Sequence, residues 1–589
     1  MDHAGGIAMG TVSEQRRVWR LLAHHAWQHL LRRLHGGALF RWRLGSGVPA
    51  RLLIAPQDLR TADAMNAADI YGGRFLFSGH LVETQGRSPF EIPDQNIDWQ
   101  RELHGFSWLR DLRAAESRIA QQNARALIDD WIKLCGGWHA VGWETPVVTR
   151  RVLSWLSHSP FVLADGDHDF YRRFLRSLTR QVRYLRRTIN ETRDGVERMQ
   201  VALALAASCV SMADQGRFAR QSMRRLNHEL MRQILPDGGH ISRNPRAMID
   251  ILADLLPIRQ AFVAQGLALP DGMMLSVDRM MPMMRFFRHG DGAFAHFNGM
   301  GSTPNDLVAT IMAYDDARGA APVNAPHAGY QRLTGGQTVV LIDTGPVPDS
   351  IVSVEAHAGC LSFEMSSGIH RIVVNCGVSH LSNAAWRQVS RSTAAHSTAT
   401  IDDTSSCRFL SDRALSKWLG SPVISGPSTV ELQRADDDTG THITASHDGY
   451  MPVFRILHER DLRLSADGTV LDGIDRFIEN APDVPDRPYA VRFHLHPQIK
   501  SSLLRGDSAV LLVCPDGEAW EFDAGGREIA LEESIYLSDV YGHRHTAQIV
   551  VRGRTKDTSA LLWQFRRTAV ARLSRRGTSD FDDTELPLE

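Results

Sequence analysis

The sequence predicts an α+β multidomain protein in which an all-α half precedes an antiparallel β half. Three observations predict it. Apolar residues recur with a helical period from about Ser13 to about Arg285, a stretch rich in Gly, Pro, Asn and Ala follows at 300–328, and apolar residues then alternate with a period of two. Because helices and strands are segregated along the chain, we expect an all-α domain at 1–299, a linker at 300–328 and a β-sandwich domain at 329–589.

The first predicted helix is the stretch EQRRVWRLLAHHAWQHLLRRLHGG. We expect one apolar stripe with a glycine stop at Gly36 and Gly37, and the stripe residues are Val18, Leu22, Leu30 and Leu34. The helix is also cationic, so an interfacial helix on a membrane surface is an alternative. A helix packed on its own domain is favoured, because most such stripes are core faces.

Six further helical patterns follow in pairs with loops between them, which is typical of a ring of helical hairpins. They cover Ala114–Leu134, Pro146–Leu156, Asp169–Ile189, Arg198–Ala213, Arg217–Ile234 and Pro245–Gln265. The longest apolar run, VALALAASCVSMA, is too short to span a bilayer and predicts a buried helix.

Many short strands with turn residues between them predict a large antiparallel sandwich in the second half. Segments such as QTVVLIDTG, HRIVVNCG and YAVRFHLHP alternate between apolar and polar residues. The segments SADGTVL and CPDGEAW contain Asp-Gly pairs, which favour hairpin turns. Sequential strands of this kind are typical of a sandwich rather than of a parallel sheet.

Composition narrows the class of protein. The composition, with 43% hydrophobic and 23% charged residues, is typical of an ordinary globular protein. The net charge of -1 predicts no nucleic-acid partner. Its six cysteines are scattered without a CxxC pair, which excludes a disulfide framework and a cysteine-rich zinc module. No secretory signal is visible, so we expect a cytoplasmic location, with the cell envelope or periplasm as the alternative.

Several motifs, taken in order, carry a resemblance to a known family. They are LPDGGHISRNP, RFFRHGDGAFAHFNG, EAHAGCLSFEM, RIVVNCG and RSTAAHSTATIDD. In this order and spacing the sequence resembles the heparinase II/III family of polysaccharide lyases. The resemblance implies an N-terminal incomplete (α/α) toroid, a C-terminal antiparallel β-sandwich, and a cleft between them that binds an acidic polysaccharide or oligosaccharide.

Lyases of this kind remove the acidic C5 proton of a uronic acid and expel the leaving oxygen. They need a group that neutralises the carboxylate, a base and an acid. The family uses a tyrosine and a histidine for proton transfer, yet Ala247 and Met248 stand where the resemblance implies that pair. Glu355 likewise stands where the family has a histidine near catalysis.

The candidate catalytic residues are therefore Glu355, His240 and Asn190. Glu355 lies between small residues before a strand and would act as acid or base if burial raised its pKa. His240 follows a Gly-Gly turn that could present its ring to the cleft, and a helix-capping role is the alternative. Asn190 ends a predicted helix, which would place it at the mouth of the toroid.

The candidate substrate-binding residues combine aromatic, amide and charged side chains. Arginine forks bind carboxylates, and aromatic rings stack on sugars. The set is Arg243, Asn244, Trp143, Glu144, Arg387 and Arg391. The alternative for Trp143 is a core position, and Arg391 is the preferred carboxylate clamp.

The resemblance also implies a structural divalent metal, zinc or calcium. Its candidate ligands are His357, His396 and Asn375, although an aspartate often stands in the place of Asn375 in the family. Two histidines with an oxygen ligand suit zinc. The alternative is that the two histidines hydrogen-bond across the sheet.

The function that these observations predict is a lyase that cleaves a uronic-acid-containing glycan by β-elimination. One alternative is a glycoside hydrolase that pairs Glu355 with Glu144 or Glu191. Another is a glycan-binding protein without catalysis, because fold alone does not fix function. A membrane-surface protein attached through the first helix is a further, less favoured alternative.

Overall fold

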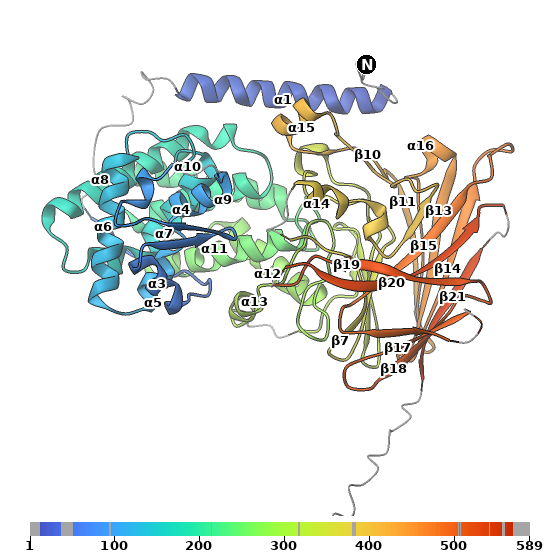
Figure 1. Ribbon diagram of the computed structural model, residues 1–589. Coiled ribbons are helices and arrows are strands. Elements are labelled where there is room, and N and C mark those ends of the chain that lie inside the picture. Colours follow the sequence, from blue (N-terminus) through green and yellow to red (C-terminus); the bar gives the residue numbers. More distant parts are fainter. Residues whose placement is uncertain are drawn as a thin grey trace, which may run out of the picture.

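The computed structural model describes residues 12–36, 51–93, 96–213, 215–315, 319–379, 384–504, 506, 508–540, 542–556 and 560–568. An incomplete (α/α) toroid forms the first half of the chain, and an antiparallel β-sandwich forms the second (Figure 1). The fold class that the sequence predicts is confirmed. The first helix, α1 (Val12–Gly36), lies across the top of both halves (Figure 1).

The described helices of the toroid after α1 run from Ala64 to Met312. They are α3 (Ala64–Tyr71), α4 (Ile97–Gly105), α5 (Leu109–Ala114), α6 (Arg118–Leu134), α7 (Thr145–Leu163), α8 (His168–Thr188), α9 (Val196–Ser211), α10 (Gly216–Gln233), α11 (Pro245–Ala264), α12 (Asp271–Phe286) and α13 (Asn305–Met312). A short hairpin of β1 (Arg74–Phe77) and β2 (His80–Glu83) lies between α3 and α4.

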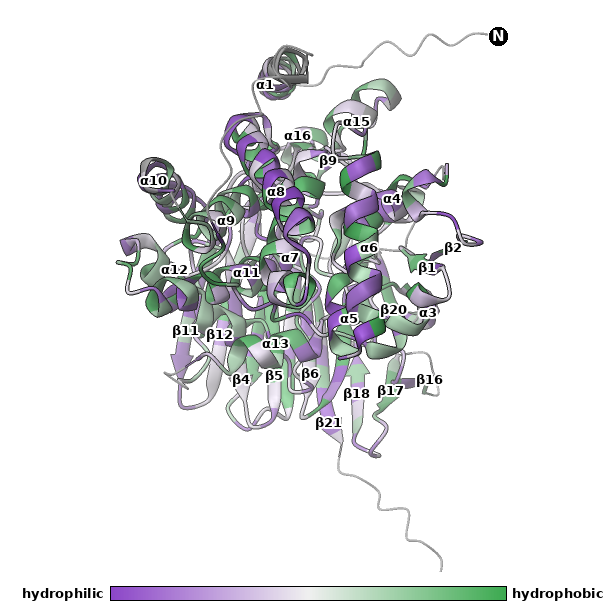
Figure 2. Cartoon of the chain, turned by 90° about the vertical axis from the view of Figure 1, so that its left-hand side faces the viewer, coloured by the Kyte–Doolittle hydropathy of each residue, from purple (hydrophilic) through white to green (hydrophobic). Residues whose placement is uncertain are grey.

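Inner and outer helices of the toroid differ in their sequence pattern. The helices α7, α9 and α11 bury residues on nearly every side, as helices enclosed by others do. The helices α6 and α8 keep one polar face, and they turn hydrophilic surface toward the viewer in Figure 2. Because α9 packs against α7, α10 and α11, the helical hairpins close around one apolar core.

The six predicted helical segments all correspond to helices, with ends shifted by a few residues. One prediction for the first helix is wrong. Leu30 is 49% exposed and does not share the buried stripe, whereas Val18 and Leu22 face the body of the protein. At 3.6 residues per turn, Leu30 lies about 120° around the helix from Val18, so the two cannot share one stripe. The segment predicted as a linker, 300–328, contains α13, whose Leu307 is buried in the toroid core.

The sandwich consists of two antiparallel sheets around a second core. The nine-stranded sheet contains β3 (Asn324–Ala325), β4 (Tyr330–Gly335), β5 (Thr338–Asp343), β6 (Phe363–Ser367), β7 (His370–Val374), β8 (Ala399–Ile401), β15 (Pro488–Leu495), β19 (Ile529–Tyr536) and β20 (Arg544–Arg554). Its order is β19-β20-β15-β7-β6-β5-β4-β3, with β8 paired to β15.

The eight-stranded sheet has the order β11-β12-β13-β14-β21-β18-β17-β16. These strands are β11 (Val430–Asp437), β12 (Gly440–His447), β13 (Ile456–Ser465), β14 (Val470–Glu479), β16 (Lys500–Leu503), β17 (Ala509–Val513), β18 (Ala519–Asp523) and β21 (Leu561–Thr568). Further short elements lie in the connections between these strands. They are the paired strands β9 (Arg408–Phe409) and β10 (Val423–Ser425) and the helices α14 (Ala384–Val389), α15 (Arg413–Leu419) and α16 (Met451–Phe454).

Buried polar side chains join the toroid to the sandwich. Glu364 on β6 accepts hydrogen bonds from the ring of His289 at 3.2 Å and from the backbone N–H of His296 at 3.0 Å. Burial would raise the pKa of Glu364, but the two histidines and a backbone N–H hold it at about 2. Asn298 donates to Asp343 at 3.1 Å. The motif HGDGAFAHFNG therefore fastens the end of the toroid to strands β5 and β6.

Candidate functional site

A cleft of about 740 Å³ opens at the top of the toroid. Aromatic rings and charged side chains form its wall together. The lining residues include His25, Gln28, Arg101, Trp138, Trp143, Glu144, Tyr184, Glu191, Thr192, Arg193, Glu197 and Trp418. Two sequence-predicted residues, Trp143 and Glu144, thus lie in the wall of a cavity.

Hydrogen bonds fix the aromatic wall in place. The indole N–H of Trp143 donates to the carbonyl of Cys135 at 2.9 Å, and the hydroxyl of Tyr184 donates to the carbonyl of Trp143 at 2.7 Å. Trp138 stacks on Trp143 with ring centroids 6.1 Å apart, and it keeps 41% of its surface exposed. Trp143 is only 2% exposed and belongs to the toroid core, so Trp138 is the ring of this pair that can stack against a flat apolar ligand face.

The charged side chains of the cleft form pairs. Arg101 contacts Glu144 at 2.7 Å, and Arg193 lies 4.0 Å from Glu197. Glu191, on the short 3-10 helix η2 (Ile189–Glu191), is buried in the same wall. The lining therefore offers carboxylate acceptors and guanidinium donors together, which suits a ligand that carries many hydroxyl groups.

Segments far apart in the sequence close the cleft. The side chain of Gln28 on α1 donates to the carbonyl of Thr192 at 3.2 Å. The ring of His25 lies 6.1 Å from the ring of Trp418, which comes from α15 in the β half. No sequence pattern indicated these three lining residues, because their neighbours in space are far away along the chain.

Glu355 lies at the boundary between toroid and sandwich, next to this cleft. Its carboxylate is exposed and accepts a hydrogen bond from the side-chain amide of Asn244 at 3.0 Å. Glu355 does not line the cleft itself: its neighbour Val354 lies near Gly420, where an added Cβ would meet Val354 at 2.9 Å and the cleft-lining Arg193 at 3.7 Å. The structure thus brings together two predicted site residues, Glu355 and Asn244, although Glu355 is not buried as we had expected for a raised pKa.

The backbone beside Glu355 is held by a buried arginine. The guanidinium of Arg391 donates to the carbonyls of Ala356 at 2.8 Å, Ser353 at 3.2 Å and Ser421 at 2.7 Å. Burial lowers the pKa of Arg391 to about 10. We predicted this arginine as a carboxylate clamp, but its donors are engaged with backbone carbonyls, so it positions the loop instead.

Arg243 is also a structural residue in this arrangement. Its guanidinium donates to four backbone carbonyls in the β half and to Asp343 at 2.5 Å. The predicted role in substrate binding does not fit a side chain whose donors are all used across the domain boundary. Arg387 is exposed on α14.

His240 and Asn190 lie apart from the Glu355 carboxylate. His240 is buried, and its two ring nitrogens bond to Ser242 at 2.8 Å and to Gln233 at 2.9 Å. Burial and nearby Arg232 lower its pKa to about 3, so the ring is neutral near pH 7. Asn190 is exposed and accepts a hydrogen bond from Arg225 at 2.7 Å. His240 does not cap a helix, which was the alternative to catalysis, because Asn244 caps α11; its ring instead joins Gln233 to Ser242.

The predicted proton-transfer position is apolar. Ala247 and Met248 lie in α11, and both are buried in the toroid, with exposures of 2% and 1%. Neither side chain can carry a proton. Any proton transfer in this chain must therefore use other residues.

The candidate metal ligands make hydrogen bonds to one another and to the backbone. His357 Nδ1 lies 3.0 Å from His396 Nε2, and His396 Nδ1 donates to the carbonyl of Ser392 at 2.7 Å. Two imidazole ligands of one tetrahedral zinc lie roughly 3.3 Å apart, whereas here His357 donates a hydrogen bond to His396. The Asn375 oxygen accepts from the backbone N–H of Ser397 at 2.9 Å. Each of the three side chains thus has a protein hydrogen-bond partner here, and a structural metal stays a prediction.

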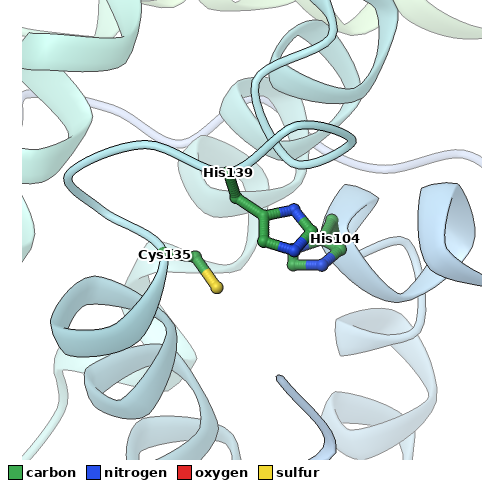
Figure 3. A group of neighbouring side chains, drawn as sticks. All are labelled: His104, Cys135 and His139. Carbon is green, nitrogen blue, oxygen red and sulfur yellow. The ribbon is translucent and has the colours of Figure 1, made fainter. Parts of the chain in front are cut away.

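A second histidine group was missed in the sequence. His104, Cys135 and His139 point toward one another beside the cleft wall (Figure 3). Trp131 donates to His104 Nδ1 at 3.0 Å, and the backbone N–H of Gly142 donates to His139 Nδ1 at 3.0 Å. Each neutral ring therefore carries its proton on Nε2, and burial raises the pKa of the Cys135 thiol to about 11. The group is better described as a support for the Trp143 loop than as a metal centre.

Comparisons with known proteins add to this geometry. Residues 317–564 match the model of the heparinase II/III-like C-terminal family. FtsZ-localized protein C of Caulobacter vibrioides is 31% identical over 554 residues, which cover 92% of this chain and 94% of that relative. Heparinase III has 14% identity and a TM-score of 0.68, and 92% of each chain is covered. A mutant of heparan sulfate lyase HepC from Pedobacter heparinus has 16% identity and a TM-score of 0.62, with coverage of 96% and 92%. At these identities the likeness to the two solved lyases shows a common fold.

Proposed function

The chain belongs to the heparinase II/III-like family, and we propose that it binds an oligosaccharide in the cleft beside Trp143 and cleaves it by β-elimination at Glu355. The observation that carries this proposal is the cleft itself. Its tryptophans offer flat apolar faces to sugar rings, and its Glu and Arg side chains offer partners to hydroxyl groups. Glu355 lies outside the lining, so a ligand would have to extend past Arg193 toward Gly420 and Val354 to bring a ring beside this carboxylate.

Each step of elimination has a candidate group. Glu355 would take the proton from C5 of a uronic acid as the bond between C4 and the leaving oxygen breaks, and that oxygen would take a proton from water. Asn244 already donates one N–H to Glu355 at 3.0 Å, and its amide has a second N–H to offer the substrate carboxylate. An acidic glycan is the proposed substrate.

A second candidate is a glycan-binding protein without catalysis. The apolar Ala247 and Met248, together with the enclosed ring of His240, favour it.

The relative from Caulobacter is named for localisation to FtsZ, and by likeness we propose that this protein acts where FtsZ assembles. A fluorescent fusion observed together with labelled FtsZ tests this location, and a diffuse cytoplasmic signal would contradict it.

A panel of uronate-containing glycans separates the candidates. Elimination gives an unsaturated product with new ultraviolet absorbance, whereas hydrolysis by carboxylates such as Glu144 and Glu191 gives reducing ends without it. We expect Glu355→Gln to lower the elimination rate about 10²-fold or more while glycan affinity is kept. As a matched control, Glu533→Gln alters an exposed glutamate on β19. Binding without any cleavage would support the second candidate, and no binding to any glycan would overturn both.

A further inference from the structure

A second cavity lies in the toroid, away from the cleft. It has a volume of about 610 Å³, and the segment before α3, the helix α5, the start of α6 and the end of α7 form its wall. We call it the α5–α7 cavity. Helix α7 begins with Thr145 in the wall of the cleft and reaches this cavity at His158, about 20 Å further along the helix axis. Among the described residues, none lines both the cleft and this cavity.

One wall of the α5–α7 cavity contains a buried histidine whose ring makes no hydrogen bond. His158 is 2% exposed, and neither of its ring nitrogens has a hydrogen-bond partner within the described part of the chain. Its Nε2 lies 3.6 Å from the carboxylate of Asp58, which is too far for a hydrogen bond. Buried polar groups in folded proteins are nearly always hydrogen-bonded. An imidazole left unbonded in the wall of a cavity therefore indicates a ligand that bonds to it.

Three guanidinium groups with unused donors border the same cavity. Arg110 and Arg113 come from α5, and Arg118 begins α6. The buried Nε of Arg110 makes no hydrogen bond and lies 3.4 Å from the carboxylate of Asp58. Arg113 and Arg118 are exposed, and neither forms an ion pair with any described residue. By contrast, Arg125 further along α6 donates to backbone carbonyls at the end of α7.

The lining of the cavity has an excess of positive charge. Its four arginines, Arg60 included, face two carboxylates, Asp58 and Glu116, so two positive charges are left over. The side chains behind the wall do not change this excess, because Asp254 is shared between Arg60 at 2.7 Å and Arg150 at 3.2 Å. The cavity is therefore suited to an anionic ligand.

We propose that the α5–α7 cavity binds a small organic molecule that carries a phosphate monoester. Such a group has a charge of about −1.5 to −2, which matches the excess, and its terminal oxygens accept the paired N–H groups of guanidinium forks. The unbonded ring of His158 would donate a further hydrogen bond to the phosphate. The apolar ring of Phe161 and the amide of Gln57 border the same cavity and would contact the organic part.

The size of the cavity supports an organic phosphate rather than a bare ion. Sites for small molecules commonly have volumes of about 300–1,000 Å³, and this cavity lies within that range. The proposal goes beyond the function proposed for the cleft and does not depend on it, because the two sites have separate walls.

Isothermal titration calorimetry of the full-length protein tests the proposal. The probes are glucose 6-phosphate and adenosine 5′-monophosphate, and the comparison compounds are glucose, adenosine and citrate. We expect at least one of the two phosphates to bind with a Kd of about 1 mM or lower. Glucose and adenosine lack the phosphate, and citrate offers carboxylates instead, so all three should bind at least tenfold more weakly.

Two variants locate the binding. The double variant Arg113→Gln, Arg118→Gln removes two exposed guanidinium groups from the cavity and should weaken phosphate binding at least tenfold. His158→Phe keeps a ring of similar bulk without nitrogen atoms and should weaken it as well. The matched control is Arg172→Gln, Arg176→Gln on α8, which changes the net charge equally at exposed arginines outside the cavity and should leave the affinity unchanged.

The outcomes are distinct. Melting curves show whether each variant is folded, and the double variant at exposed arginines decides the test if His158→Phe does not fold. The proposal would be overturned if the wild type bound neither phosphate, if either folded cavity variant kept its affinity, or if the α8 control lost as much affinity. Equal binding of citrate, or of glucose or adenosine, would overturn the assignment of a phosphate.

Discussion

Replacing Arg243 by methionine should destabilise the junction between toroid and sandwich. The guanidinium donates to the carbonyls of Ala328 at 2.8 Å, Gly329 at 2.9 Å, Gly345 at 3.0 Å and Pro346 at 2.8 Å, and it pairs with Asp343. Methionine has a similar length but no donor. Asp343, whose side chain is 3% exposed, would remain as a buried carboxylate without a counter-charge.

Breaking a buried ion pair from one side costs about 3–5 kcal/mol, and we expect a loss of this size in the free energy of unfolding. The measurement is urea-induced unfolding followed by circular dichroism. A matched control, Arg20→Met, breaks a pair whose side chains are 65% and 49% exposed, so it should cost about 1 kcal/mol or less. The double variant Arg243→Met, Asp343→Leu removes the unpaired charge and should be more stable than Arg243→Met alone. If Arg243→Met cost no more than the control, the structural role assigned to Arg243 would be refuted.

Three further predictions concern pH, a glycine and the metal. Burial lowers the pKa of His240 and His496 to about 3, so between about pH 6.5 and 3 the unfolded chain binds more protons than the folded one. The folded state holds these two rings in their neutral form, so its stability is full above about pH 6.5 and is lost as pH falls. The melting temperature should therefore drop from pH 7 to pH 4.5, and a melting temperature that does not change with pH would contradict this. Gly238 has φ of +93° and a Cβ there would collide with the carbonyl of Arg279, so Gly238→Ala should cost about 2 kcal/mol or more, whereas Gly266→Ala, at φ of +64° with open space, should cost about 1 kcal/mol. If a structural metal is present, elemental analysis should find one equivalent that His357→Ala loses together with some thermal stability, and metal-free purified protein would exclude it.

Strong periodicity made the helices predictable. The helices α6 to α11 have long apolar patterns, either on one face, as in α6 and α8, or on nearly every side, as in α7, α9 and α11, and the sequence therefore located each of them to within several residues. Elements of only a few residues were missed, such as β1 and β2, because a short segment contains too little pattern. The position of Leu30 was misjudged because its angle around the helix, rather than its apolar character, decides which face it occupies.

Residues of the site were predictable only where a single segment of the sequence carries chemically suitable side chains and also borders the cleft. Trp143 and Glu144 lie at the start of α7 and both border the cleft, but Trp143 is also buried in the toroid core, and their role in binding substrate stays a prediction. The partners of an arginine are not visible in sequence, so a guanidinium bound to backbone carbonyls, such as that of Arg391, looks the same as one that binds substrate. The contribution of α1 to the cleft depends on a contact between Gln28 and Thr192, which are far apart in the sequence.

The backbone around Glu355 has a consequence for how this protein can change in evolution. Arg391 holds the carbonyls on both sides of position 355, while the side chain at that position projects into solvent. These backbone contacts do not involve the Glu355 side chain. A histidine, as the resemblance implies for related lyases, would lose the hydrogen bond that Glu355 accepts from Asn244 but would leave the contacts of Arg391 in place. The chemistry at this boundary can therefore be exchanged by a single substitution, while the surrounding fold is inherited unchanged.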